Sequence, residues 1–154
     1  MEINEAVKKL LDKPEPKDLK EKVEFGQQLK RFFDKARYNS EVWKWVEGGA
    51  LYFIDKYDLY DYVFGKQISK KSFFSELGIP YTTASLRIDM WKTYVVQHGF
   101  SLDELKDCET YKLGVCVSLL RETNHEEALR IIGLAKRGNL SRSDFMIEAF
   151  KKNE

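Results

Sequence analysis

A cluster of hydrogen-bonding side chains follows Pro80, in the stretch FFSELGIPYTTASLRIDMW at residues 73–91. The cluster consists of Tyr81, Thr82, Thr83, Ser85 and Arg87. Arginine can donate two hydrogen bonds to guanine, and threonine offers an adaptable hydroxyl together with a methyl group that can touch thymine. The chemistry that these residues offer is non-covalent recognition of base edges, from the N-terminal end of a helix.

Basic side chains flank this cluster, although the chain as a whole is almost neutral. It has 26 Lys and Arg against 25 Asp and Glu, so its total charge supplies no attraction for nucleic acid. Residues 66–98, however, carry five basic and two acidic side chains, and the two flanking parts are each slightly acidic. We therefore expect phosphate contacts from the lysines of this segment, which are Lys66, Lys70, Lys71 and Lys92.

Other residues with potential for chemistry form weaker patterns. Asp55, Asp58 and Asp61 recur every third position, but such steps rotate by about 60° around a helix, so the carboxylates diverge. Asp89 lies beside the polar cluster, where an exposed carboxylate repels phosphates, and Leu86 is an apolar neighbour that can contact a thymine methyl. The aspartates at 55–61 predict a solvated acidic face and no metal site.

The histidines and cysteines do not form a catalytic or zinc-binding pattern. His98 and His125 lie beside no serine or cysteine that they would activate, and with Cys108 and Cys116 they lack paired zinc-ligand spacing. The sequence EGGA is not followed by the residues of a phosphate-binding loop. We expect no catalytic residue, no metal, no cofactor and no small-molecule substrate, and therefore a protein that is not an enzyme.

The elements that must position the cluster are helical, because apolar residues recur every three to four positions nearly everywhere. The pattern predicts helices over 2–12 and 18–38, separated by Pro14 and Pro16. A third helix is predicted from a cap at Asn39 or Ser40 to Gly65. We expect a short N-terminal arm with its linker at 1–16 and one helical domain at 17–154.

Two further helices meet at Gly78. The first begins near Ser69, and Pro80 is suited to the first helical position of the second. The second helix has a predicted buried stripe, which consists of Ala84, Ile88, Trp91 and Val95. The predicted two-helix motif spans about 69–97. Beyond it, serine or asparagine precedes an acidic residue by three positions at 101–104, 124–127 and 141–144, which predicts three helix starts after a helix at 111–121. The sequence thus predicts an all-α bundle of eight or nine short helices.

No basic-then-apolar leader is seen at the N-terminus, and the apolar stretches are too interrupted to cross a membrane. The two cysteines are expected to be reduced. We expect a protein of the cytoplasm of a bacterial or archaeal host cell, with no membrane partner.

The run SFFSELGIPYTTASLRI resembles the helix-turn-helix of the ParB and KorB plasmid-partition proteins and of related phage and mobile-element proteins. Upstream, GGALYFIDKYDLYDYVFGKQISKKSFF looks like the long helix before such a unit in phage-encoded proteins, and KRGNLSRSDF is similar to a segment that follows it. The resemblance covers roughly 48–150. It implies DNA binding, with Thr82, Thr83, Ser85 and Arg87 matching the reading helix and Lys70 and Lys71 matching the backbone contacts.

The sequence therefore predicts an all-α, multi-helix protein containing a helix-turn-helix, which binds double-stranded DNA as a homodimer. Its expected role is a sequence-specific or architectural DNA-binding protein of a mobile genetic element, acting in transcription regulation or partition. The alternative is a protein–protein interaction module or viral accessory protein that reuses the same fold. The two hypotheses differ in whether residues 81–87 are exposed or buried against another helix.

Overall fold

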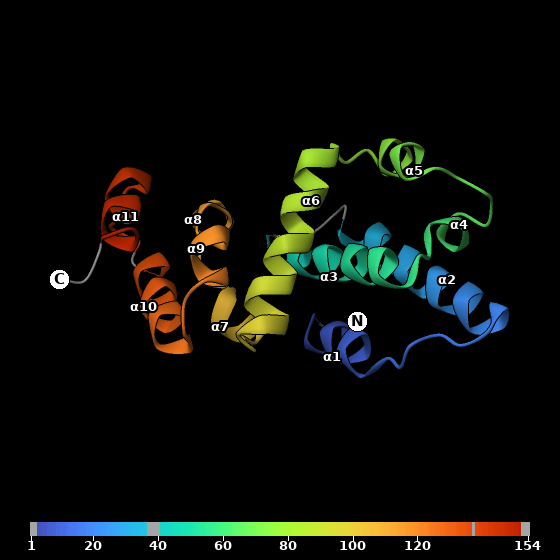
Figure 1. Ribbon diagram of the computed structural model, residues 1–154, viewed down its shortest axis with the longest axis horizontal. Coiled ribbons are helices and arrows are strands. Elements are labelled where there is room, and N and C mark those ends of the chain that lie inside the picture. The colour runs from blue at the N-terminus through green and yellow to red at the C-terminus, as the bar shows by residue number, and fades with distance from the viewer. Residues whose placement is uncertain (1–2, 37–40, 137, 152–154) are drawn as a thin grey trace. The chain divides into compact units, whose positions relative to one another are not determined.

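The computed structural model describes residues 3–36, 41–136 and 138–151. The described residues form eleven α-helices and one π-helical segment, and they contain no strand, which confirms the all-α prediction (Figure 1). The chain divides into two compact units, residues 1–91 and 92–154. Within the described ranges, no helix has both the length and the apolar character needed to cross a membrane.

The first unit contains six helices arranged around α3. In chain order they are α1 (Ile3–Asp12), α2 (Leu19–Ala36), α3 (Glu41–Tyr57), α4 (Tyr60–Val63), α5 (Lys70–Leu77) and α6 (Tyr81–Met90). Helix α3 packs against α1, α2 and α6, and α4 packs against α2 (Figure 1). The core between these helices is rich in aromatic side chains, among them the fully buried Phe25, Phe32, Phe73 and Trp91.

The start of α2 agrees with the sequence prediction. Helix α1 ends at Asp12, before the two prolines, and α2 begins one residue after Asp18. The Asp18 carboxylate accepts a hydrogen bond from the Glu21 backbone N–H at 2.8 Å, which satisfies an amide that the first helical turn leaves unpaired. The proposed caps of α3, Asn39 and Ser40, lie outside the described residues.

The third predicted helix does not continue to Gly65. It ends at Tyr57, because Asp58 adopts a left-handed backbone conformation with φ of 52°. Aspartate tolerates this conformation better than most residues do. After the turn, a separate short helix begins at Tyr60, and Leu59, Tyr60 and Val63 are buried in the core. The gain in buried apolar area offsets the loss of helix continuity.

The second unit contains five short α-helices after the π-helical segment Trp91–Gln97, which continues the chain from α6. They are α7 (Leu102–Leu105), α8 (Thr110–Val115), α9 (Val117–Arg121), α10 (His125–Ala135) and α11 (Arg142–Ala149). The predicted helix at 111–121 is interrupted at Cys116, which separates α8 from α9. The core of this unit includes the fully buried Tyr94, Leu105, Leu113, Ile131 and Phe145.

The three helix starts predicted in this unit are confirmed. Ser101 and Glu104 form a reciprocal capping box, with each side chain accepting from the backbone N–H of the other. The Asn124 side chain accepts from the Glu127 N–H at 2.9 Å, and the Ser141 hydroxyl oxygen accepts from the Asp144 N–H at 3.0 Å. Short-range side-chain chemistry therefore fixes where α7, α10 and α11 begin.

Candidate nucleic-acid interface

Helices α5 and α6 are joined by a tight turn whose backbone hydrogen bonds are satisfied. The Ser69 hydroxyl caps α5 by accepting from the Ser72 N–H at 3.1 Å. At the other end Gly78 has φ of 74°, a conformation that glycine adopts without strain, and the Ile79 N–H donates to the Phe74 carbonyl at 3.2 Å. Pro80 then takes the N-cap position of α6, one residue before the first helical position predicted for it.

One face of α6 is fixed against α3 through two adjacent glycines. A Cβ atom at Gly48 would lie 2.7 Å from the Arg87 carbonyl oxygen, and one at Gly49 would lie 2.9 Å from the Trp91 ring. Only glycine leaves room for so close an approach of the two helices. Of the predicted buried stripe, Ala84 and Trp91 are completely buried and Val95 is buried, whereas Ile88 is only half-buried.

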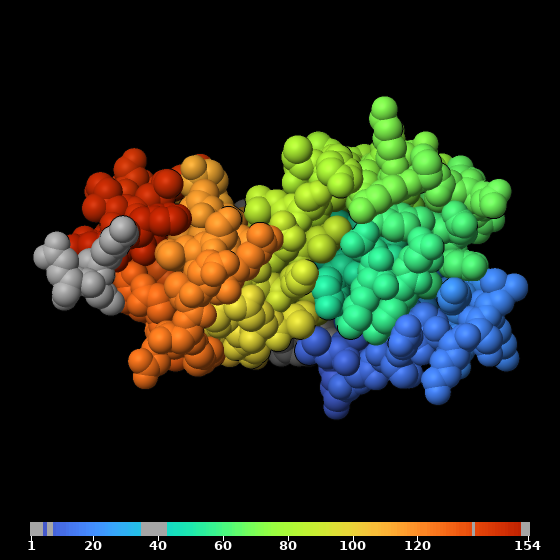
Figure 2. All heavy atoms as spheres, in the orientation of Figure 1, coloured from blue at the N-terminus to red at the C-terminus, as the bar shows by residue number. Residues whose placement is uncertain are grey.

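The opposite face of α6 is open to solvent in its first turns. Tyr81 is 57% exposed, Leu86 is 43% exposed, and Thr82 is also exposed. Thr83 and Ser85 are half-buried. In Figure 2, green and yellow-green atoms of the α5 and α6 region form part of the visible surface. Four of the five residues predicted for base readout thus lie at or near the surface, at the start of one helix.

Arg87, the fifth residue, pairs with an acidic side chain of α3. Its guanidinium contacts the carboxylate of Glu47, and the two side chains are only 24% and 11% exposed, respectively. Taking the guanidinium away would leave the Glu47 carboxylate in a largely buried position without this partner, which is energetically costly. The geometry therefore gives Arg87 a role in holding α6 on α3.

Glu47 was not among the residues predicted from the sequence. It lies forty residues before Arg87, so no local spacing relates the two. The available signal was the single carboxylate in the largely apolar and aromatic run VWKWVEGGALYFI, in which Lys44 is the other charged residue. This carboxylate lies directly before the two glycines that admit α6. A buried carboxylate in such a run needs a cationic or hydrogen-bonding partner.

The predicted phosphate-binding lysines differ in their surroundings. Lys66 pairs with Glu76 at 2.7 Å, and Lys70 pairs with Asp55 at 3.0 Å. The hydrogen bond that the Lys70 ammonium donates to the Asp55 carboxylate raises the pKa of Lys70, so the ammonium stays charged. Lys71 and Lys92 are both exposed, the first on α5 and the second at the beginning of the second unit.

Aromatic rings fix the place where α5 meets α6. The Tyr81 ring lies edge-on to Phe74, with the ring centroids 5.7 Å apart. The Lys70 ammonium lies 6.0 Å from the Tyr81 centroid and 5.9 Å from that of Tyr60. The Tyr60 hydroxyl donates to the Asp55 carboxylate at 2.7 Å. Burial is the main cause that raises the pKa of Tyr60, and this hydrogen bond raises it further, so the phenol is neutral at ordinary pH.

An open, polar hollow of about 520 Å³ lies between α5 and the segment that precedes it, residues 66–69. Its lining combines three serines with one acidic and one basic side chain, and consists of Lys66, Gln67, Ile68, Ser69, Ser72, Ser75 and Glu76. Serine hydroxyls of this kind are suited to hydrogen bonds with phosphate oxygens.

The residues considered for metal binding or catalysis have structural contacts instead. Asp55 binds Lys70 and Tyr60, and the Asp61 carboxylate accepts from the Ile68 N–H at 3.0 Å. In the part of the chain that the structure describes, no group of three or more His, Cys, Asp or Glu side chains is arranged to hold a metal ion.

The cysteines and histidines of the second unit are also accounted for by packing. Burial raises the pKa of Cys108 and of Cys116 to about 11, so both thiols are protonated at neutral pH. The His98 ring nitrogen Nε2 lies 2.7 Å from the Leu120 carbonyl oxygen. His125 is exposed at the first position of α10, and its ring stacks on that of Phe100.

Comparison of the chain with protein-family models, with curated proteins and with solved structures found no match.

Proposed function

We propose that the protein binds duplex DNA through α5 and α6 acting as a helix-turn-helix, with the N-terminal part of α6 in the major groove. The observation that carries the proposal is the two-sided character of α6. Its inner face is fixed on α3 through Gly48 and Gly49, whereas Tyr81 and Thr82 face solvent in its first turn. This is the arrangement that a recognition helix requires, because its first residues must reach base edges.

The surroundings of this helix supply groups for the DNA backbone. Lys71 and Lys70 lie at the start of α5, and the serines of the adjoining hollow add hydroxyl donors. The Lys70 ammonium is paired with the Asp55 carboxylate, so Lys70 contributes less to phosphate binding than Lys71 does. Binding as a homodimer, and a role for the protein in the regulation or partition of a mobile element, rest on the resemblance in the sequence.

A protein-interaction module is the second candidate, and it is favoured by the pairing of the basic residues. Lys66, Lys70 and Arg87 each have a carboxylate partner, which lowers the positive potential around α6. The exposed apolar surface of Tyr81 and Leu86 is also compatible with a protein partner.

The test is a fluorescence anisotropy titration of random-sequence duplex DNA at two salt concentrations, with the variant Thr82→Asp. An acidic residue in the first turn of a helix favours the helix, so this variant should fold, but its charge repels phosphates. Ser143→Asp is the matched control, because Ser143 is exposed at the same position, second in the helix, of α11.

We expect duplex binding by the wild type and by Ser143→Asp, and none by Thr82→Asp. Equal binding by all three proteins would show that the start of α6 does not contact DNA. Failure of the wild type to bind DNA at either salt concentration would favour the interaction module.

A further inference from the structure

The exposed face of α6 differs from the one that the sequence suggested, and the difference bears on the DNA sequence that it reads. Thr82 and Leu86 are four residues apart on α6, so their side chains lie one above the other on the same face. Both are exposed, and together they present a hydroxyl, a threonine methyl and an isobutyl group.

Arg87, the group suited to guanine, is paired with a carboxylate of α3. Bidentate recognition of guanine needs a free guanidinium or ammonium. The Arg87 guanidinium contacts Glu47, whose side chain is 11% exposed on α3. If Arg87 left Glu47 to bind a base, the Glu47 carboxylate would remain unpaired and poorly solvated. The free-energy cost of this state opposes the hydrogen bonds gained with guanine.

Two neighbouring residues, Tyr81 and Asp89, also have contacts within the protein. Tyr81 is anchored on α5 by its edge-on contact with Phe74. Asp89, which follows Leu86 by three residues, is half-buried and has an interaction of its own within the protein. Thr83 and Ser85 are half-buried, so Thr82 and Leu86 form the exposed pair on one face of α6.

Given the proposed function, on which this inference rests, we infer that the preferred DNA site is rich in A·T pairs, which Leu86 and Thr82 recognise through the C5-methyl group of thymine. In the major groove this methyl group distinguishes thymine from the other bases, and apolar side chains recognise it by contact. Guanine recognition by Arg87 is not part of the mechanism.

The test begins with the enrichment of bound duplexes from a random-sequence pool by the wild-type protein. Thymines of the enriched site are then replaced by deoxyuridine, which removes the C5-methyl group and keeps the Watson–Crick pairing. We expect affinity to fall roughly fourfold for each methyl group contacted, the ratio that corresponds to about 0.8 kcal/mol of lost apolar burial. Deoxyuridine placed in the flanking sequence is the control and should have no effect.

The variant Leu86→Ala assigns the contact. Since Leu86 is exposed, alanine in its place should leave the fold intact, and we expect this variant to lose most of its preference for thymine over deoxyuridine. Leu129→Ala is the matched control, because Leu129 is 46% exposed on α10 in the other unit, and it should keep the full preference.

The outcomes separate this inference from the proposed function. A wild-type protein that binds DNA but does not distinguish thymine from deoxyuridine, or that enriches sites whose recognition depends on guanine and Arg87, would overturn the inference and leave DNA binding intact. A protein that binds no duplex would overturn both.

Discussion

At the level of single residues, the pair formed by Arg87 and Glu47 decides how much of α6 is available to a ligand. The pair joins α6 to α3 from a largely buried position, so it contributes to the fixed placement of the helix. The exposed residues at the start of α6 are in this way presented by a rigid support. Binding sites on rigid supports lose less conformational entropy when a ligand binds.

Loss of this pair should affect stability more than DNA discrimination. For Arg87→Ala we expect a fall of about 1 to 3 kcal/mol in the free energy of unfolding, because the Glu47 carboxylate loses its charged hydrogen-bond donor. Denaturant unfolding measures this change, with Arg31→Ala, an exposed arginine of α2, as the control. If Arg87→Ala were as stable as the wild type and lost affinity only for the preferred duplex, Arg87 would be assigned to base readout.

At the level of elements, Trp91 links the end of α6 to α3. Its ring is fully buried against Gly49, and its indole Nε1–H has no hydrogen-bond partner among the described residues. The ring therefore contributes through packing, while its N–H carries a desolvation cost.

We expect Trp91→Ala to lower the free energy of unfolding by about 3 to 5 kcal/mol, the usual cost of removing a large buried aromatic ring. Trp91→Phe should cost clearly less, because it keeps an aromatic ring in the core and removes the unpaired N–H. Thermal and denaturant unfolding of the two variants test this order. An unaltered melting temperature for Trp91→Ala would mean that the ring is not part of the core.

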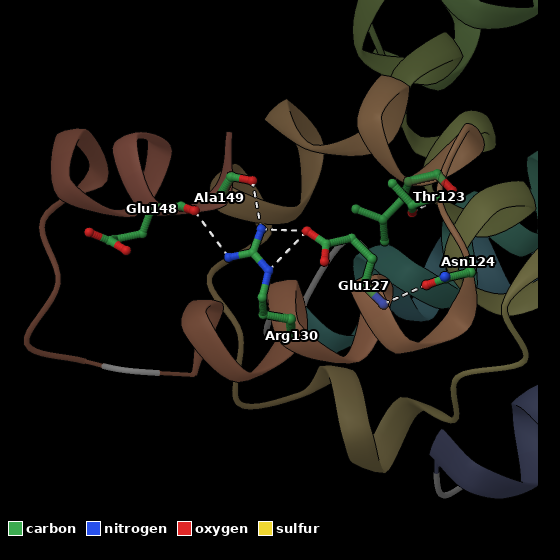
Figure 3. A network of polar contacts seen from close by, with 7 residues as sticks. Thr123, Asn124, Glu127, Arg130, Glu148 and Ala149 are labelled. Atoms are coloured by element: carbon green, nitrogen blue, oxygen red, sulfur yellow. Dashed lines mark hydrogen bonds and ion pairs between the residues drawn. The ribbon is translucent and has the colours of Figure 1, made fainter. Parts of the chain in front are cut away.

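In the second unit, Arg130 of α10 binds the C-terminal end of α11. Its guanidinium donates to the carbonyl oxygens of Glu148 and Ala149, each at 3.1 Å, and also to the Glu127 carboxylate, as Figure 3 shows. The hydrogen bond from Arg130 lowers the pKa of Glu127 below its ordinary value of 4.5. The same glutamate supplies the backbone N–H that binds the Asn124 cap.

This pair makes a small part of the stability dependent on pH. Because the pKa of Glu127 is lower in the folded state, its contribution is complete above about pH 4.5 and is lost as the pH falls through the folded-state value. The effect should be at most about 1 kcal/mol, since both side chains are partly exposed. We expect Glu127→Gln to lose less stability than the wild type between pH 6 and about pH 3, whereas Glu126→Gln, an exposed neighbour, should follow the wild type. Identical profiles for all three proteins would contradict this role of the pair.

The helix ends that were predictable from the sequence are those with a local cause. Ser69, Ser101, Asn124 and Ser141 each bind an amide three residues further along the chain, so a short sequence pattern contains the whole interaction. The end of α3 at Asp58 was not predictable in this way. It follows from the burial of Leu59 and Tyr60 by residues distant in the sequence.

The same distinction applies to the candidate interface. The exposed start of α6 follows from local amphipathic spacing, which places Ala84 inward and Thr82 outward. Arg87 is paired with Glu47, and Lys70 is paired with Asp55. Both ion pairs join residues far apart in the sequence, so they form only when the first unit folds. The spacing of residues in the sequence therefore predicts which residues at the start of α6 are exposed. Tertiary contacts determine which basic side chains of α5 and α6 can bind phosphate or bases.

At the level of the whole molecule, the boundary between the two compact units falls within a continuous helical segment. Residues 81–97 run from α6 into the π-helical turns, and the division follows Trp91. No proline or glycine marks this position, whereas the more conspicuous prolines at 14 and 16 separate α1 from α2 within the first unit. A boundary of this kind is visible only in the pattern of tertiary packing.

The proposed DNA binding also has a whole-molecule consequence, because the nearly neutral chain must depend on a few local lysines for phosphate contacts. Each contact adds about 0.9 to the magnitude of the slope of log affinity against log salt concentration. A small number of contacts predicts a shallow slope, much less than that of a strongly basic protein.

The most direct test is the salt dependence of duplex binding by the wild type, by Lys71→Glu and by Lys70→Glu/Lys71→Glu, measured by anisotropy after circular dichroism has confirmed that each is folded. Lys8→Glu/Lys9→Glu, an adjacent pair of exposed lysines on α1, is the control for net charge. The account predicts that the slope decreases by about one unit for Lys71→Glu, that binding is lost in the Lys70/Lys71 double variant, and that the control binds as the wild type does. Unchanged affinity and slope in the Lys70/Lys71 double variant would contradict DNA binding through α5 and α6.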